Sequence, residues 1–255
     1  MAMPFFTPGD TPGPNFLELL RRQGVASSFE TQGEIAPQLL TQVTHGTTIV
    51  AMRYADGVIM AGDRRATSGH LISHRTMEKV FPADRHSAVA IAGAAGPAVD
   101  MVRLFQLQIQ HYEKVEGKSL SLNGKANQLS LMVKGHLPAA MQGLAVVPLF
   151  AGYDKTIGRG RLFQYDVTGG RYEEQEYATS GSGSLHAGTT LKLGYSEDQN
   201  RDTAVRLVVK SLMVAADEDS ATGGPDSLRS IYPVVAVIDD IGYERAGDDE
   251  LATIV

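Results

Sequence analysis

The sequence has 255 residues, 43% of them hydrophobic and 20% charged, which is ample apolar material for a folded core. Its net charge of −6 argues against a broad nucleic-acid-binding surface, and the lack of cysteine excludes disulfides, a thiol nucleophile and cysteine-containing zinc sites. No apolar run reaches the roughly 18–20 residues of a membrane span, and the opening residues lack the features of an export signal. We therefore expect a cytoplasmic protein with one large domain or two small ones.

The first 46 residues differ in character from the rest. Four prolines fall between Pro4 and Pro14, where they cannot sustain a helix or a central strand. A short helix is predicted over 16–24, with Asn15 as its cap. We interpret 1–46 as an extension with little core of its own, and its composition alone equally fits a disordered tail.

The strongest local signal in the sequence is a β-hairpin directly after this extension. Residues 47–54 and 58–62 are rich in β-branched and apolar side chains. The Asp-Gly pair at 56–57 is typical of a two-residue turn between such strands. A further buried strand is predicted over 86–93.

Periodicity predicts two long helices in the middle of the chain, over 97–115 and 123–142. Apolar residues recur there at spacings of three and four, as they do on one face of a helix. The side chains expected to face the core are Val102, Phe105, Ile109 and Tyr112 in the first helix, and Leu129, Met132, Val133, Leu137 and Met141 in the second.

Strands and then helices follow once more in the second half of the chain. The last helix is expected to begin with a capping box formed by Ser196 and Gln199. The last strand is expected to end the core. The predicted strands lie around 144–152, 160–167, 172–179 and 231–239, with a turn at 169–170, and the predicted helices at about 184–193 and 198–217.

The order of these elements indicates the fold class. Strands and helix pairs do not alternate as βαβ units do, so the pattern favours an α+β architecture. Two sheets stacked face to face, with a helix layer outside each, would bury every apolar stripe. The periodicity permits this four-layer arrangement without requiring it.

Thr47 lies where the extension meets the predicted domain, directly after Gly46. If the bond between them were cut, Thr47 would carry a hydroxyl and a free α-amine on one residue. An α-amine titrates at about pH 8, so it can accept the proton of the hydroxyl, and nucleophile and base would come from a single residue. In the uncut chain the same nitrogen is an amide without basicity. The spacing alone favours an ordinary threonine at the start of a strand.

Asp63 is a candidate partner because it closes an apolar strand, where a buried carboxylate needs a counter-charge. With 56–57 as the turn, the hairpin places Asp63 opposite Val50, a few residues from Thr47 and on the other face. A direct contact with Thr47 would require a bend near Gly62. Taken alone, Asp63 is more typical of a strand-end cap or a surface charge.

Lys79 is the candidate cation. In a strand it would share a face with Met77 and Phe81, which is the face expected to be buried. A buried ammonium needs an anion, and Asp63 is available. Such a cation near Thr47 would favour its alkoxide and keep its amine neutral. The alternative is a lysine that buries its stem and keeps its charge in water.

Three further segments contain groups that could support this chemistry. Gly93 ends a strand and could offer its N–H to a developing oxyanion, although small residues there equally indicate tight packing. The SGSGS run at 180–184 offers hydroxyls and amides but lacks the lysine of a phosphate-binding loop. Asp219 lies in an acidic run at 217–224, and it could face either solvent or a site.

Together these motifs resemble those of proteasome β subunits, most nearly the bacterial (actinobacterial) 20S type. HGTTIV, GDRRAT, the lysine of TMEKVF, IAGAAG, SGSGS and DEDSATGG follow one another in the order and spacing of that family. The resemblance runs from Thr47 to about Asp240. It implies an N-terminal-nucleophile hydrolase with an α+β, four-layer αββα sandwich, a propeptide at 1–46 and a catalytic domain at 47–255.

The resemblance also implies a role for each central residue. Thr47 matches the nucleophile, which self-cleavage after Gly46 exposes. Asp63 and Lys79 match the charge pair that tunes it. Gly93 matches the residue whose N–H serves the oxyanion hole.

Helper groups and a substrate cleft are implied in the same way. Ser182 and Asp219 match the hydroxyl and carboxylate that steady the threonine amine and a water. Thr222 stands where the family usually has serine, and the surrounding SATGG stretch fits the family pattern loosely. Met77 with small neighbours implies a roomy pocket and cleavage after apolar residues. Thr67 and Ala95 match the backbone positions that align the substrate as an added strand, and Ala66, Met77, Ile91, Ala95 and Val99 match the lining of the pocket for the residue before the scissile bond.

The implied reaction is peptide-bond hydrolysis through an acyl-enzyme ester on Thr47, without metal or organic cofactor. The implied assembly is a stack of seven-membered rings in the order α, β, β, α, which an ATP-dependent unfoldase ring supplies with unfolded chains. The alternatives are an HslV-type peptidase of two rings without α subunits and a non-catalytic scaffold β subunit. Arg65, the SATGG stretch and the long extension favour the proteasome, and the presence of Thr47, Asp63 and Lys79 disfavours a scaffold.

Overall fold

The computed structural model describes residues 46–69 and 71–255. Its strands are β1 (Thr48–Tyr54), β2 (Gly57–Gly62), β3 (Ala66–Ser68), β4 (Leu71–His74), β5 (Val80–Asp84), β6 (Ser87–Gly93), β7 (Val146–Asp154), β8 (Arg159–Tyr165), β9 (Arg171–Glu174), β10 (Tyr177–Gly181), β11 (Val234–Ile238) and β12 (Tyr243–Arg245). Its helices are α3 (Ala95–Glu116), α4 (Leu122–Gly135), α5 (Leu137–Ala140), α6 (Ser184–Gly194), α7 (Arg201–Glu218) and α8 (Asp248–Ala252), with a 3₁₀ turn, η1 (Ser227–Arg229).

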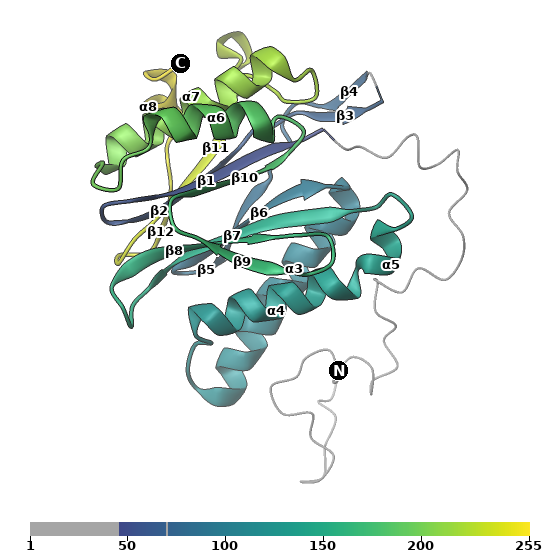
Figure 1. Ribbon diagram of the computed structural model, residues 1–255, viewed down its shortest axis with the longest axis vertical. Coiled ribbons are helices and arrows are strands. Elements are labelled where there is room, and N and C mark those ends of the chain that lie inside the picture. Colours follow the sequence, from purple (N-terminus) through teal and green to yellow (C-terminus); the bar gives the residue numbers. More distant parts are fainter. Residues whose placement is uncertain (1–45, 70) are drawn as a thin grey trace.

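The first sheet has five antiparallel strands in the order β10-β1-β2-β11-β12 (Figure 1). The predicted hairpin forms β1 and β2, but its register differs from the expected one. Tyr54 pairs with Gly57, so the turn begins one residue earlier than the Asp-Gly rule indicates. As a result, the amide of Asp63 donates to the carbonyl of Thr48 (3.1 Å), whereas the expected partner was Val50.

In this register Gly57 begins β2 and lies beside β11, the next strand of the same sheet. A Cβ at Gly57 would lie 2.2 Å from the carbonyl oxygen of Ile238 in β11. The glycine therefore serves the close approach of two strands, and it is not available as the second turn residue.

The second sheet has the order β5-β6-β7-β8-β9, and β3 and β4 form a separate two-stranded sheet. The single strand predicted over 172–179 is wrong. Its first part is β9, an edge strand that pairs with β8, and its second part is β10, which pairs with β1 in the first sheet. The chain thus crosses from one sheet to the other at 175–176, and this crossing brings the end of β10 to the start of β1.

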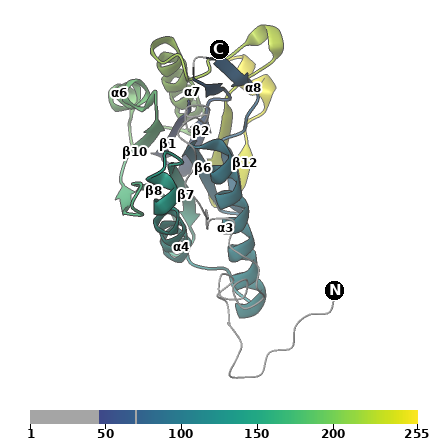
Figure 2. The same cartoon turned by 90° about the vertical axis from the view of Figure 1, so that its right-hand side faces the viewer.

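The two sheets stack face to face between layers of helices, as Figures 1 and 2 show. Helices α6 and α7 cover the first sheet, and α3 and α4 cover the second. Between the sheets lies a third cluster that is rich in alanine, which allows the two backbones to approach closely. The expected four-layer αββα sandwich is confirmed.

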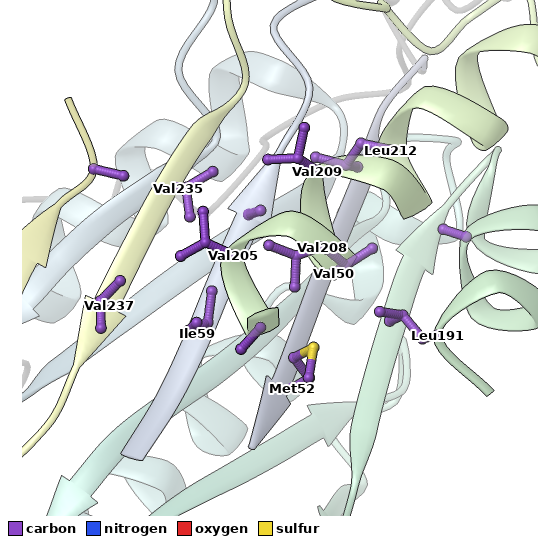
Figure 3. Packing of buried hydrophobic residues seen from close by; sticks show 14 of the residues in the cluster. Val50, Met52, Ile59, Leu191, Val205, Val208, Val209, Leu212, Val235 and Val237 are labelled. Carbon is purple, nitrogen blue, oxygen red and sulfur yellow. The ribbon is translucent and has the colours of Figure 1, made fainter. Parts of the chain in front are cut away.

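Alternation along β1 shows how one strand supplies two of these clusters. Val50 and Met52 point toward α7, in the cluster drawn in Figure 3, whereas Ile49 and Ala51 point toward the second sheet. All four side chains are fully buried. Because burial of each large apolar side chain contributes roughly 1.5–3 kcal/mol, β1 and the residue before it are held firmly in place.

The central helices agree only in part with the periodicity. The helix predicted over 97–115 corresponds to α3. The helix predicted over 123–142 breaks at His136 into α4 and the short α5, because Pro138 lies in the first turn of α5 and cannot continue an α-helical hydrogen-bond ladder. Met141, which was expected to face the core, is consequently 82% exposed.

The last helix and the C-terminal segment also differ from expectation. Asn200, rather than the capping box of Ser196 and Gln199, caps α7 by accepting the amide of Thr203 (2.9 Å). The core does not end at β11, since β12 and α8 follow it and Leu251 of α8 is buried against the first sheet.

Most of the predicted extension, including its short helix at 16–24, lies outside the described residues; Gly46 is its one described residue. Within the described ranges, none of the helices has the length and apolar character that crossing a membrane requires.

Candidate active site

Thr47 lies directly before β1, at one end of the first sheet. The pairing of β1 with β10 sets Thr48 opposite Gly181, so that the amide of Ser182 donates to the Thr47 carbonyl (2.9 Å). Thr47 is only 4% exposed, and its hydroxyl donates to the carbonyl oxygen of Gly46 (2.7 Å). In the uncut chain the candidate nucleophile is therefore turned toward the peptide bond that precedes it.

The side chain of Asp63 is completely buried at the end of β2. Its Oδ1 accepts the amide of Thr48 (2.8 Å) and the Nζ of Lys79 (2.6 Å). Its Oδ2 accepts the amides of Arg65 and Gly223, both at 2.9 Å. Four donors thus replace the lost hydration of the carboxylate, and the expected ion pair with Lys79 is confirmed.

Lys79 is 1% exposed, and each N–H of its ammonium has an acceptor. Besides Asp63, Nζ donates to the carbonyl of Arg65 (2.6 Å) and to the carbonyl of Gly46 (3.4 Å). Three acceptors match the three N–H groups of an ammonium. Burial holds the pKa of Lys79 below its ordinary value, and the charge of Asp63 acts in the opposite direction.

Lys79 is buried, as predicted, but the prediction that it shares a strand face with Phe81 is wrong. Lys79 precedes β5, which begins at Val80, and it does not share a face with Phe81. Phe81 packs against the cluster under α3. Lys79 instead lies against Gly62 of the first sheet: a Cβ added to Gly62 would be 3.4 Å from the Cβ of Lys79. The cation thus comes from one sheet and its carboxylate from the other.

Gly46 is buried between two segments of the site. A Cβ on this residue would lie 2.5 Å from Oγ1 of Thr67 and 2.6 Å from Cβ of Ala221. Because these contacts leave no room for a side chain, the carbonyl that receives the Thr47 and Lys79 hydrogen bonds is held in a fixed position.

Ser182 and Asp219 meet beside Thr47. The hydroxyl of Ser182, which follows β10, donates to Oδ2 of Asp219 (2.5 Å) and lies 3.3 Å from the Thr47 carbonyl oxygen. Asp219 is the residue that ends α7. The fold therefore brings together the three residues that sequence reasoning associated, from three distant parts of the chain.

Asp219 is held as a carboxylate by two hydroxyls and an amide. Its Oδ2 also accepts the hydroxyl of Thr222 (2.6 Å), and its Oδ1 accepts the amide of Ala221 (3.1 Å). Partial burial alone would raise the pKa of Asp219, but the donors, led by the hydroxyls of Ser182 and Thr222, hold it below its ordinary value. The threonine at 222 keeps the hydroxyl that the family pattern supplies from serine.

Gly93 ends β6 in a conformation that suits glycine. Its φ is +109°, and a Cβ would lie 2.1 Å from the carbonyl oxygen of Ala145. Thr67 lies in β3, which pairs only with β4 among the described strands. In the part of the chain that the structure describes, the other edge of β3 has no partner strand, which is the arrangement that strand addition requires.

Backbone hydrogen bonds place two of the residues expected to line the substrate pocket, Ile91 and Met77. The amide of Ile91 donates to the Lys79 carbonyl (2.9 Å), and the amide of Met77 donates to the carbonyl of Arg64 (3.0 Å). Ala95 opens α3, and Val99 lies four residues further along the helix. Ala66 and Ile91 are buried, and Met77, Ala95 and Val99 are partly buried.

Sequence reasoning missed the backbone groups of Arg65 and Gly223 and the side chain of Thr48. Every residue type carries an amide and a carbonyl, so no pattern marks the positions that use them. Thr48 is different, because a hydroxyl within the apolar run of β1 is visible in the sequence, and this side chain is 0% exposed.

Comparisons with known proteins identify the family of this chain. Residues 43–230 match the family model described as proteasome subunit. The chain is 58% identical over its whole length to the proteasome subunit beta of Acidimicrobium ferrooxidans, covering 92% of that protein. It is 53% identical to that of Streptomyces griseus and 51% identical to that of Frankia casuarinae, with 98% of this chain and 88% and 90% of those proteins covered. The chain therefore belongs to the proteasome β subunits, the threonine peptidases of the 20S core.

Proposed function

We propose that residues 1–46 are a propeptide, that Thr47 cuts the bond after Gly46, and that the freed Thr47 then hydrolyses peptide bonds. One observation carries this proposal. The Thr47 hydroxyl and the Lys79 ammonium converge on the same carbonyl oxygen, that of Gly46, at 2.7 and 3.4 Å. A buried cation on this oxygen polarises the carbonyl and stabilises the negative charge that develops when a nucleophile adds.

Processing follows from this arrangement. The Thr47 hydroxyl oxygen adds to the Gly46 carbonyl carbon, the bond from that carbon to the Thr47 nitrogen breaks, and the nitrogen takes up the hydroxyl proton. The product is an ester between Gly46 and Thr47. Water then cleaves the ester, restores the hydroxyl, and leaves a carboxylate on Gly46 and a free α-amine on Thr47.

The mature reaction uses the amine that processing creates. It accepts the hydroxyl proton as the oxygen attacks a substrate carbonyl, and it passes that proton to the leaving amine. Lys79, held by Asp63, supplies the positive charge beside the alkoxide. The N–H of Gly93 is assigned to the oxyanion, and water resolves the acyl-enzyme.

The remaining residues bind and orient. Ser182 and Asp219 steady the amine and the hydrolytic water, for which their contact beside Thr47 provides support. Thr67 and Ala95 align the substrate as an added strand. The pocket formed by Ala66, Met77, Ile91, Ala95 and Val99 favours cleavage after apolar residues.

Family membership supports a proposal for the assembly as well. We infer that this chain forms seven-membered β rings, that rings of α-type subunits flank them, and that the sites face a closed chamber. An ATP-dependent unfoldase supplies unfolded chains to this chamber in the cytoplasm. An HslV-type assembly would lack α subunits, so co-purification with an α-type partner distinguishes the two.

The Thr47→Ala variant, co-expressed with its α-type partner, tests the proposal. Hydrolysis of a fluorogenic peptide should fall at least about 1000-fold, and intact mass should show the uncut chain in assembled particles. Thr47→Ser, which keeps the hydroxyl, is the matched control and should still be processed. Substantial hydrolysis by Thr47→Ala would contradict the proposal.

A further inference from the structure

Thr48 carries a buried hydroxyl next to the nucleophile that the proposed mechanism does not use. Its oxygen accepts the amide of Gly183 (3.0 Å) and lies 2.5 Å from the hydroxyl oxygen of Thr222. Both threonines are 0% exposed. The contact therefore has no access to solvent that could replace either partner.

Gly183 is shaped to admit this pair of hydroxyls. A Cβ at this position would lie 2.5 Å from Oγ1 of Thr48 and 2.8 Å from Oγ1 of Thr222. Thr48 is also β-branched and lies in a strand, so its χ1 angle is strongly restricted and its hydroxyl points in one direction.

The hydrogen bonds in this chain of hydroxyls can be donated in only one direction. An amide can only donate, so Thr48 accepts from Gly183 and keeps its own proton for Thr222. An ionised carboxylate can only accept, so the proton of Thr222 goes to Oδ2 of Asp219 (2.6 Å). The order of donation is thus Gly183, Thr48, Thr222 and Asp219.

Oδ2 of Asp219 also accepts the hydroxyl of Ser182 and so sets the orientation of that hydroxyl. Ser182 has one hydroxyl proton, and its contact with Asp219 (2.5 Å) is much shorter than its contact with the Thr47 carbonyl (3.3 Å). Its proton therefore goes to Asp219, and its lone pairs remain available beside residue 47. They can accept an N–H of the α-amine once that amine is free.

We propose that Thr48 is a positioning residue for the peptidase reaction, whose hydroxyl orients Thr222 and, through Asp219, the Ser182 oxygen that receives the Thr47 amine. This inference rests on the proposed function, since it concerns the amine that processing creates. Thr48 does not touch the substrate and acts only through its neighbours.

The isosteric variant Thr48→Val tests the role, because it keeps the shape and the β-strand preference and removes only the hydroxyl. We expect kcat of the mature particle to fall about tenfold with KM unchanged. The acidic limb of the pH profile should move to higher pH, because the Thr222 hydroxyl loses the donor that orients it, its hydrogen bond to Asp219 weakens, and the pKa of Asp219 rises. Thr48→Ser should restore both quantities.

A matched control lies on the adjacent strand. The hydroxyl of Thr179 in β10 donates to the carbonyl of Ser184 (3.1 Å) and has no link to Asp219. Thr179→Val should therefore leave kcat and the pH profile unchanged. Intact mass confirms that each variant is processed, and Thr48→Ala tests the same link if valine at position 48 prevents assembly.

A double-mutant cycle on kcat shows whether Thr48 acts through Thr222 or independently of it. If Thr48 acts only through Thr222, the double variant Thr48→Val/Thr222→Val should be no slower than Thr222→Val alone. Additive losses, or an unchanged kcat and pH profile in Thr48→Val, would overturn the inference. Failure of the proposed function gives a different result, namely hydrolysis that survives in Thr47→Ala.

Discussion

Within the described residues, two lysine–aspartate pairs contain a buried lysine, and one of these pairs belongs to the candidate site. The Lys79 and Asp63 side chains are 1% and 0% exposed, and those of Lys125 and Asp84 are 7% and 19% exposed. Both pairs join residues from different elements. The two pairs match in residue type and charge, and both lysines are buried, whereas Asp84 is only partly buried.

The difference lies in the other groups within reach of each ion. Lys79 also donates to the carbonyls of Gly46 and Arg65, so it contacts the carbonyl of the bond that we propose is cut. Lys125 of α4 pairs with Asp84 at the end of β5. Asp84 in turn accepts the amide of His86 (3.0 Å) and the hydroxyl of Ser87 (2.6 Å).

The second pair therefore fastens a helix to a turn at the edge of the sheet. An ion pair can take part in the reaction when one of its members also donates a hydrogen bond to a reacting group. The variants below test this distinction.

The largest effect is expected from Lys79→Met. Removal of the cation from the scissile carbonyl and the alkoxide should lower kcat/KM at least about 1000-fold, or about 4 kcal/mol, and should block processing. Asp63 keeps its three amide donors, so the subunit should still fold and assemble. Peptide hydrolysis and intact mass measure both outcomes, and normal turnover would remove Lys79 from the mechanism.

Lys125→Met should have the opposite profile. Loss of the partner leaves a partly buried carboxylate, so the free energy of unfolding should fall by about 2–3 kcal/mol while kcat remains at the wild-type value. Denaturant unfolding gives the first quantity and peptide hydrolysis the second. Lys134→Met, which removes an exposed cation from the same helix, is the control and should change stability by less than about 0.5 kcal/mol.

A smaller effect concerns the acid stability that Asp84 provides. Burial alone would raise the pKa of Asp84, but Lys125 and the hydroxyl of Ser87 outweigh it and lower the pKa below the ordinary 3.8. The stabilisation is therefore present above about pH 3.8 and is lost as pH falls from there through the lower folded value.

Unfolding of the double variant Asp84→Asn/Lys125→Met should accordingly depend less steeply on pH in this acidic range. Denaturant unfolding at a series of pH values measures the slope. Equal slopes in the wild type and the double variant would show that this pair contributes nothing to acid stability.

The sequence predicted most elements of the fold, because apolar periodicity records which faces are buried. The sequence-based prediction failed where the structure of a segment depends on tertiary contacts as well as on local preference. Gly57 fits a turn by local rules, but in the structure it begins β2 and lies close to Ile238, a tertiary contact that the hairpin rule does not include. The strand predicted over 172–179 is continuous in its pattern, yet its two halves pair in different sheets, which only the tertiary arrangement decides.

The site was predictable to the extent that side-chain chemistry marks it. Thr47, Asp63 and Lys79 could be selected by residue type and by their resemblance to a family. The meeting of the Thr47 hydroxyl and the Lys79 ammonium on the Gly46 carbonyl could not be predicted, because it depends on the stacking of two sheets. Nor could the backbone donors of Arg65 and Gly223, since an amide has no sequence signature.

The most direct test of the central claim is the intact mass of this subunit taken from proteolytically active particles. The account predicts a chain that begins at Thr47 and has lost residues 1–46. Fully active particles in which every copy still carries those residues would contradict it.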